Sequence, residues 1–259
     1  MISISIILPV QKIDLHVFRS ITTTVSSISS AFCNIIYDIN IIASQRVFDF
    51  DCKFVTLLNE LPVNLHLEDS ATHSGALNTG ISLTSCTHLL VLNPGDTLIL
   101  GKASNLISTF NDFDRIYFFN VVSDHQYIGS ITQKKIIGTV FSSLKHMSAT
   151  KLLNFPHQGI LIPRSLHRSG LMYLESMNIR MDYELLHNIL SCFPQTAVHF
   201  NPFSLTYYPT GGKSMKIENR HIFYGEEILI NLKYKRLPRL STLARFLFWK
   251  FRASVMIRH

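Results

Sequence analysis

The stretch that most constrains the fold is LLVLNPGDTL, residues 89–98, where an apolar run stops at a turn and a single acid. A run this apolar is typical of a strand covered on both faces, and Pro94 with Gly95 turns the chain out of the sheet at the carboxyl end of that strand. Open α/β sheets bind ligands at this end. Asp96 could therefore hold a divalent cation, Mn²⁺ or Mg²⁺, against a diphosphate. Alternatively, Asp96 caps a helix expected over residues 102–110, because Asp is a favoured N-cap residue.

The size and composition of the chain favour one globular domain. A chain of 259 residues can bury a full α/β core, and its 47% hydrophobic and 16% charged residues exclude a disordered protein. No apolar stretch reaches the ~18 residues of a spanning helix, and the opening ISISIILPV lacks the features of a signal peptide. The four cysteines have no metal-like spacing, so we expect reduced thiols in a cytoplasmic protein.

Strand and helix patterns alternate through the first half of the chain. Strands are expected over residues 4–10, 33–39, 63–67 and 87–93, and helices over residues 14–30 and 72–85. This alternation predicts parallel βαβ units and a mostly parallel central sheet. A further strand is expected over residues 115–123, followed by a hairpin or excursion over residues 126–137.

The positive charge is concentrated at the C-terminus. The net charge is +7, and residues 233–259 contain eight Lys or Arg and no acid. On a helix, one broad face would carry Leu243, Phe246, Leu247 and Phe251. This pattern is typical of an interfacial helix on anionic lipid, so we expect a domain over residues 1–232 and a basic amphipathic tail over residues 233–259. The alternative is a terminal helix that docks its apolar face on the domain. We expect no nucleic acid partner, because no DNA- or RNA-binding motif is present.

Common nucleotide and hydrolase motifs are absent from the sequence. It contains neither GxGxxG after the first strand nor GxxxxGK[ST] anywhere, and neither GxSxG nor HExxH occurs. A dinucleotide oxidoreductase and a P-loop enzyme are therefore not expected.

Five segments in a fixed order resemble a known family. They are ISIILPV, SGALNTGISLTSCTHLLVLNPGDTL, FPHQGILIPRSLHRSG, NIRMDYELL and YYPTGGKS. Together they resemble the inverting family 2 glycosyltransferases, which have the GT-A (Rossmann-like) fold, and among these the bacterial polysaccharide-assembly branch typified by colanic acid transferases. The matching positions are Ala76, Asn78, Gly80 and Ile81, then Leu92, Asn93, Gly95 and Asp96, then His157 and Gln158, then Asp182 and Tyr183, and finally Gly211, Gly212 and Ser214.

This resemblance implies a reaction and two catalytic carboxylates. The family transfers a sugar from a nucleotide diphosphate to an acceptor hydroxyl in a single displacement at the anomeric carbon. Such a reaction needs a general base for the hydroxyl proton and a neutralising charge on the leaving diphosphate. The resemblance assigns the base to Asp182 and the diphosphate side to Asp96 with its cation. The alternative for Asp182 is an N-cap on the helix that starts at DYELLHNIL.

The same resemblance implies a donor-binding site. Its residues are Asp38, Asp69, Asn78, Gly80, Asn93, His157, Gln158 and Lys213. The spacing to Asn78 leaves Glu68 as an alternative to Asp69, and Asp38 has the alternative of a solvated acid at a strand end. His157 has a structural alternative in its turn. The segment of residues 211–214 resembles a lid in which Lys213 approaches phosphate, and a plain turn is the alternative.

The sequence also departs from the family. The segment YDINIIAS lacks the Asp-Gly-x-Ser-x-Asp that usually follows the second strand, and Asp96 stands without a preceding acid. Two functions from different classes therefore remain. The first is an active transferase in surface-polysaccharide assembly, with a nucleotide-sugar donor, a lipid-linked or saccharide acceptor and peripheral attachment to the inner face of the membrane. The second is a catalytically lapsed protein that binds nucleotide or sugar or acts as a scaffold.

Overall fold

The computed structural model describes residues 2–11, 14–32, 35–44, 56–68, 72–99, 110, 112–126, 132–137, 156–192, 198–209, 216–235 and 237–256. Predictions that fall on other residues lie outside this part of the chain. They include the helix over residues 102–110 except for Phe110, and the segment of residues 211–214.

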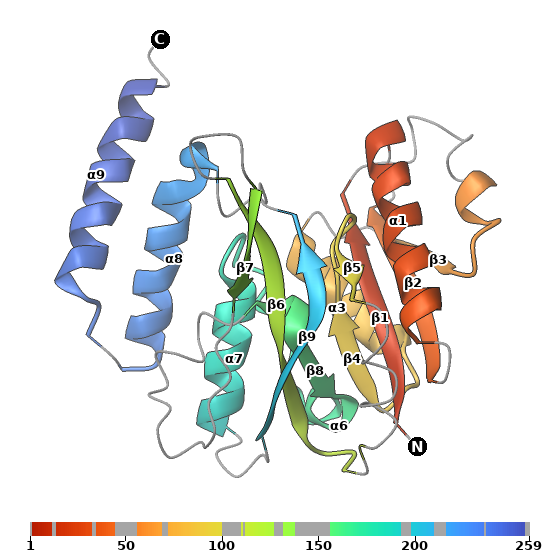
Figure 1. Ribbon diagram of the computed structural model, residues 1–259. Coiled ribbons are helices and arrows are strands. Elements are labelled where there is room, and N and C mark those ends of the chain that lie inside the picture. The colour runs from red at the N-terminus through yellow and green to blue at the C-terminus, as the bar shows by residue number, and fades with distance from the viewer. Residues whose placement is uncertain are drawn as a thin grey trace.

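The first half of the chain forms parallel βαβ units, as the alternation predicts (Figure 1). The strands β1 (Ser3–Val10), β2 (Ile36–Ser44), β3 (Asn64–Glu68) and β4 (His88–Val91) lie in the order β3-β2-β1-β4 and pair in parallel. Helix α1 (Leu15–Ala31) starts at Asp14, whose side chain accepts a hydrogen bond from the backbone N–H of Val17. Helix α3 (His73–Leu83) is capped in the same way by Thr72.

The second half of the chain changes the direction of the strands. Strand β8 (Ile160–Pro163) runs antiparallel to β4, and β6 (Ile116–Gln126) runs antiparallel to β8. Strand β9 (Val198–Tyr208) pairs in parallel with β6 and in antiparallel with the short β5 (Thr97–Leu98). The hairpin expected over residues 126–137 is confirmed, because β7 (Thr132–Ile137) pairs in antiparallel with β6.

Helices complete the second half. They are η3 (His157–Gly159), α6 (Arg164–Arg168), α7 (Met181–Cys192), η5 (Ile217–Asn219), α8 (Arg220–Lys233) and α9 (Leu240–Met256). Helices α8 and α9 lie side by side at one edge of the molecule, with α9 outermost (Figure 1). None of the described helices combines the length and the apolarity that a membrane-spanning helix requires.

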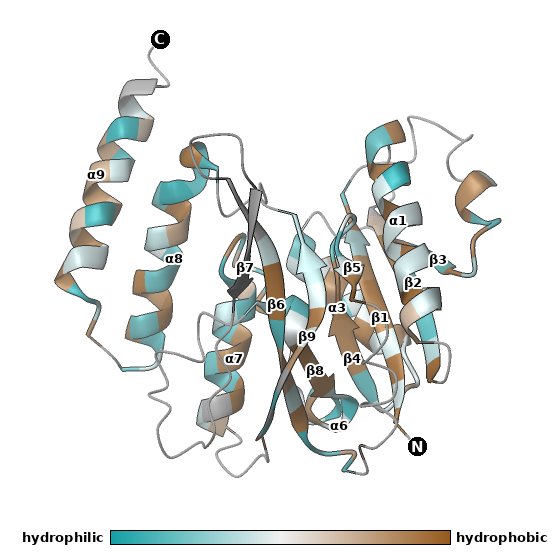
Figure 2. Cartoon of the chain, in the orientation of Figure 1, coloured by the Kyte–Doolittle hydropathy of each residue, from teal (hydrophilic) through white to brown (hydrophobic). Residues whose placement is uncertain are grey.

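The sheet buries apolar side chains on both faces. Ile6 and Leu8 belong to a cluster that includes Ile21 and Ile28 of α1, while the intervening Ile7 belongs to a second cluster with residues of α3 and α7. This alternation follows from the two-residue period of a strand. All four residues of β4 are buried, and brown apolar segments run through the central strands in Figure 2. The α/β fold with a largely parallel first half is therefore confirmed.

Candidate functional site

The turn after β4 holds Asp96 at the carboxyl end of that strand. The backbone N–H of Asp96 donates to the carbonyl of Asn93 at 3.0 Å, and its Oδ2 atom accepts from the N–H of Asn93 at 2.7 Å. Gly95 has a φ of +99°, a conformation that favours glycine. Its N–H donates to the hydroxyl of Thr24 on α1. Asp96 does not cap a helix, because the strand β5 follows it directly.

His157 reaches the same edge of the sheet because β8 is antiparallel to β4. Their register pairs His88 with Pro163 and Leu89 with Ile162, so the amino end of β8 lies beside the carboxyl end of β4. His157 lies in η3, immediately before β8. Its Nε2 atom is 3.5 Å from Nδ2 of Asn93. The reversal of direction thus brings together two segments of the predicted site.

Asp182 approaches His157 from the first turn of α7. Oδ2 of Asp182 is 3.6 Å from Nδ1 of His157, and Oδ1 accepts from the N–H of Tyr183 at 2.8 Å. The helix begins at Met181, so Asp182 lies inside the first turn and the N-cap alternative is wrong. A carboxylate in this turn is stabilised by the positive end of the helix dipole. Its side chain keeps 32% of its surface exposed, so it remains reachable by a ligand.

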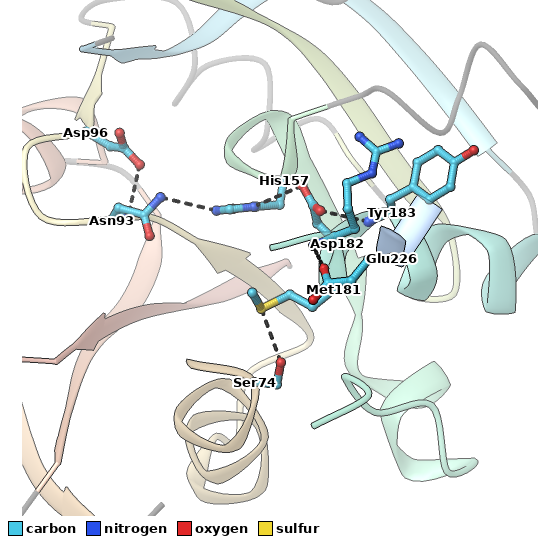
Figure 3. A network of polar contacts seen from close by, with 9 residues as sticks. Ser74, Asn93, Asp96, His157, Met181, Asp182, Tyr183 and Glu226 are labelled. Atoms are coloured by element: carbon cyan, nitrogen blue, oxygen red, sulfur yellow. Dashed lines mark hydrogen bonds and ion pairs between the residues drawn. The ribbon is translucent and has the colours of Figure 1, made fainter. Parts of the chain in front are cut away.

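These residues form a continuous polar chain from one carboxylate to the other. It runs from Asp96 through Asn93 and His157 to Asp182, as Figure 3 shows. Gln158 also hydrogen-bonds Asp96 through its side chain. Five of the predicted site residues therefore lie together at the carboxyl end of β4.

The two carboxylates have opposite electrostatic environments. Burial raises the pKa of Asp96 to about 6 and outweighs the hydrogen bonds and the charge of His157 that act to lower it. Burial also acts to raise the pKa of Asp182. There, the contact with His157, the charge of Arg180 and the N–H of Tyr183 outweigh burial, and the pKa lies below its ordinary value. The ionised form of Asp182 is therefore favoured by its surroundings, while burial disfavours the ionised form of Asp96.

Glu226 of α8 fixes the backbone that leads into Asp182. Its Oε1 atom accepts from the N–H of Asn178 at 2.6 Å, and its Oε2 atom accepts from those of Ile179 and Arg180 at 3.0 and 2.8 Å. Glu226 is buried. A carboxylate that takes three backbone donors holds their peptide units in one arrangement. The sequence analysis missed this residue, because no motif marks it.

The segment that leads into α7 is also contacted by Ser74 of α3, and its own Arg180 contacts Tyr183 and Glu227. The Ser74 hydroxyl on α3 contacts the carbonyl of Met177 and the sulfur of Met181, each at 3.2 Å. The Arg180 guanidinium lies 3.9 Å from the ring centre of Tyr183 and 3.5 Å from Oε2 of Glu227. The start of α7 is thus clamped between α3 and α8, which limits the positions that Asp182 can take.

Asp38 does not lie at this edge of the sheet. The second strand was expected to end near Ile39, but β2 continues to Ser44 because Ile41, Ile42 and Ala43 are buried in the sheet. Asp38 therefore lies toward the amino end of the parallel strands. It accepts a hydrogen bond from Nδ2 of Asn40 at 2.8 Å. The expectation that Asp38 ends the strand is wrong.

Asn78 and Gly80 have structural contacts that explain their presence. Nδ2 of Asn78 donates to the carbonyl of Tyr173 at 3.0 Å, and its Oδ1 atom accepts from the N–H of Tyr173 at 2.9 Å. A Cβ atom at Gly80 would lie 2.6 Å from Cγ2 of Ile7. Gly80 therefore allows α3 to approach β1, and Asn78 ties α3 to the segment before α7. The structure does not bring either residue to the polar chain.

Of the remaining donor-site predictions, only the alternative residue Glu68 lies in the described part of the chain. Asp69 and Lys213 lie outside the described residues. Glu68, the alternative to Asp69, is buried and accepts from the hydroxyl of Thr79 at 2.8 Å.

Asp96 could hold a divalent cation if other ligands completed the coordination of the ion. Asp96 offers a hard oxygen ligand, and its raised pKa shows a buried charge that a cation would offset. Among the described residues, however, no group of three or more His, Cys, Asp or Glu side chains could hold a metal ion. A cation held by Asp96 would therefore need its other ligands from a bound molecule or from water.

The fold matches structures of S. aureus TarS, although no family model and no curated protein matches the chain. TarS 1-349 matches with a TM-score of 0.60 and 11% identity over 96% of this chain and 72% of that chain. Its complex with UDP-GlcNAc matches with 0.60 and 13% identity, over 96% and 73%. A longer TarS structure matches with 0.58 and 10% identity, over 96% and 43%. At these identities the shared property is the fold, a GT-A-like single domain.

Proposed function

We propose that this protein is a nucleotide-sugar glycosyltransferase that inverts the anomeric centre. One observation carries the proposal: in a GT-A fold, a polar chain joins Asp96 to Asp182 at the carboxyl end of β4, and their pKa values are shifted in opposite directions. Paired carboxylates whose environments separate their pKa values are typical of sites in which each has its own task. The complexes of TarS with UDP and UDP-GlcNAc favour the same class of donor.

Asp182 is the proposed general base. Its pKa lies below the ordinary value, so the carboxylate is ionised and can accept the proton of an acceptor hydroxyl. His157 orients one oxygen of this carboxylate, and the N–H of Tyr183 holds the other. As the acceptor oxygen bonds to the anomeric carbon, the bond to the donor diphosphate breaks on the opposite face, which inverts the centre.

Asp96 is the proposed residue on the diphosphate side. With Asn93 beside it, Asp96 would hold a Mn²⁺ or Mg²⁺ ion together with the diphosphate oxygens. A bound cation supplies positive charge where the leaving diphosphate gains negative charge. Because one protein carboxylate contributes, we expect weak affinity for the cation alone and stronger binding in the presence of nucleotide diphosphate.

The proposed acceptor is a lipid-linked or other saccharide in surface-polysaccharide assembly. This part of the proposal rests on the resemblance to the polysaccharide-assembly branch. The acceptor would enter beside Asp182, because that carboxylate is the more exposed of the two.

The test is a screen of nucleotide sugars with Mn²⁺ present, measured by thermal stabilisation and by release of nucleoside diphosphate. We expect one donor class to raise the melting temperature and to be turned over. Saturation at about 100 times Kd corresponds to about 2.7 kcal/mol of added stability. Asp182→Asn should lower turnover by ~100-fold or more and change donor affinity by a few-fold at most.

The outcomes separate the two candidate functions. Stabilisation by a donor with no turnover, even with saccharide acceptors, would favour the lapsed binding protein. A variant Asp182→Asn that keeps more than about a tenth of the wild-type rate would show that another group is the base. If no nucleotide sugar stabilises the protein, the proposed function is wrong.

A further inference from the structure

Several large apolar side chains of α8 and α9 are exposed. Leu240, Leu247 and Phe251 of α9 are 84%, 64% and 73% exposed, and Leu229 and Leu232 of α8 are also exposed. Figure 2 shows brown segments along both helices at the edge of the molecule, where α9 is the outermost element. Exposed apolar residues that gather on one surface indicate an interaction site, whereas scattered ones do not.

Helix α9 has two apolar faces, and the structure uses one of them. Thr242 is buried and its hydroxyl donates to Oε1 of Glu227 on α8, while the ring of Phe246 lies against Gly225. At 100° per residue, Leu240, Ala244, Leu247 and Phe251 fall on the opposite side of α9 from these contacts. The alternative of a docked terminal helix therefore accounts for the inner face and leaves the outer face without a partner among the described residues.

The charges around this outer face are of one sign. Residues 233–259 hold eight of the 24 Lys and Arg and none of the 17 acids, which leaves sixteen cations against seventeen acids in residues 1–232. On α9, Arg245, Lys250 and Arg252 project between the inner and outer faces, and no described acid forms an ion pair with them.

The two acids of α8 do not offset this charge at the surface. Glu226 is buried against the segment before α7, and Glu227 contacts Arg180 and Thr242. An apolar strip flanked by cations, on a helix that carries no acid, is the arrangement of helices that lie on anionic bilayers.

We propose that the outer face of α9 docks on an anionic membrane surface. Leu240, Leu247 and Phe251 enter the boundary between headgroups and acyl chains, and Arg245, Lys250 and Arg252 contact lipid phosphates. A second copy of the chain is a poorer occupant, because a symmetric pair would place Arg245, Lys250 and Arg252 of one copy close to the same three cations of the other.

This docking would also fix the height of the proposed site above the bilayer. Helix α8 carries Glu226, which holds the backbone leading to Asp182. The surface that meets the membrane and the proposed base are therefore connected through one helix. This step rests on the proposed function and on a lipid-linked acceptor, whereas the docking itself does not.

The test uses the full chain without donor, so its result is independent of transfer activity. Flotation is measured with vesicles of phosphatidylcholine alone and of phosphatidylcholine mixed with phosphatidylglycerol. One variant combines Leu247→Ser with Phe251→Ser, and another combines Arg245→Gln, Lys250→Gln and Arg252→Gln. The matched control combines Ile36→Ser with Leu83→Ser, which are exposed apolar residues outside the two helices.

We expect the intact protein and the control to float with the anionic vesicles and each of the other variants to bind about ten-fold more weakly or worse. Binding should also fall as salt is raised. Circular dichroism melts confirm that each variant is folded. The proposal is overturned if the intact protein ignores anionic vesicles, binds neutral ones equally, or loses as much binding in the control. It is also overturned if light scattering shows a dimer that Leu247→Ser with Phe251→Ser dissociates.

Discussion

His157 and Asp182 face each other at a distance of 3.6 Å between Nδ1 and Oδ2, although β8, α6 and residues 169–180 separate η3 from α7 along the chain. The contact and the charge of His157 are among the causes that keep the pKa of Asp182 below its ordinary value. Removing the imidazole should therefore raise that pKa.

We predict that His157→Gln moves the acid limb of the pH profile of kcat/KM to higher pH. A base must be ionised to work, so a higher pKa requires a higher pH before activity appears. The measurement is the initial rate across pH with a competent donor and acceptor. His199→Gln, remote from Asp182 on β9, serves as the control and should leave the limb in place. An unchanged limb in His157→Gln would show that His157 does not set the protonation of the base.

The second prediction concerns binding of the diphosphate. Asp96→Asn removes the charged ligand of the proposed cation while keeping the shape of the side chain. Loss of one charge-assisted contact should weaken binding of nucleoside diphosphate with Mn²⁺ by about 2 kcal/mol, or roughly 30-fold. Isothermal calorimetry with and without Mn²⁺ gives the value. Asp38→Asn is the matched control and should bind as the wild type does. Equal affinities of Asp96→Asn and wild type for the diphosphate would contradict the assignment of Asp96 as a ligand of the cation.

The third prediction is the pH dependence of stability that Asp96 causes without ligands. Its folded pKa of about 6 lies above the unfolded value of 3.8, so the folded state holds this proton more tightly. The stabilising contribution is complete below pH 3.8 and is lost as the pH rises through about 6. Asp96→Asn cannot ionise, and between pH 5 and pH 8 the wild type loses the contribution of about one pKa unit. The free energy of unfolding of Asp96→Asn, relative to that of wild type, should therefore be higher at pH 8 than at pH 5 by about 1.4 kcal/mol. Urea denaturation at both values measures the difference, and a constant difference contradicts the assignment.

The fourth prediction tests the role of Glu226 in placing Asp182. Glu226→Gln sets an amide N–H against backbone N–H groups, which should destabilise the fold by about 1–3 kcal/mol. The loss of position at Asp182 should also reduce kcat more than donor affinity. Glu227→Gln is the matched control, since Glu227 contacts the side chains of Arg180 and Thr242. A rate for Glu226→Gln equal to that of the control, measured well below the melting temperature, would show that Glu226 supports the fold alone.

The sequence predicted the first half of the fold well because its strands and helices follow clear periods. The buried run at residues 89–92 and the turn at Pro94 and Gly95 locate Asp96 without any tertiary information. The convergence of Asp96, His157 and Asp182 could be inferred through the family resemblance alone. His157 reaches Asp96 because β8 runs antiparallel to β4, and a short apolar run such as ILIP does not reveal the direction of its strand.

Two of the predicted donor-site residues have contacts that maintain the fold. A motif shared by a family contains residues that maintain the fold beside residues that bind ligands, and sequence does not separate them. Asn78 and Gly80 have contacts of the first kind, since Asn78 ties α3 to Tyr173 and Gly80 permits close packing on Ile7. Glu226 could not be found at all, because its partners are backbone N–H groups far away along the chain, which leave no pattern of side chains.

The position of β8 between β4 and β6 also governs how the chain must fold. Strand β4 is paired with β1 on one side, and its other edge stays open until β8 has been synthesised and inserted. All four residues of β4 are apolar or buried in the finished protein, so this open edge is a template for pairing with another chain. A fragment that ends before β8 should therefore aggregate. During synthesis, the carboxyl end of β4, where the candidate site forms, therefore belongs to an unpaired strand edge. This edge is prone to aggregation until β8 has been synthesised and paired with it.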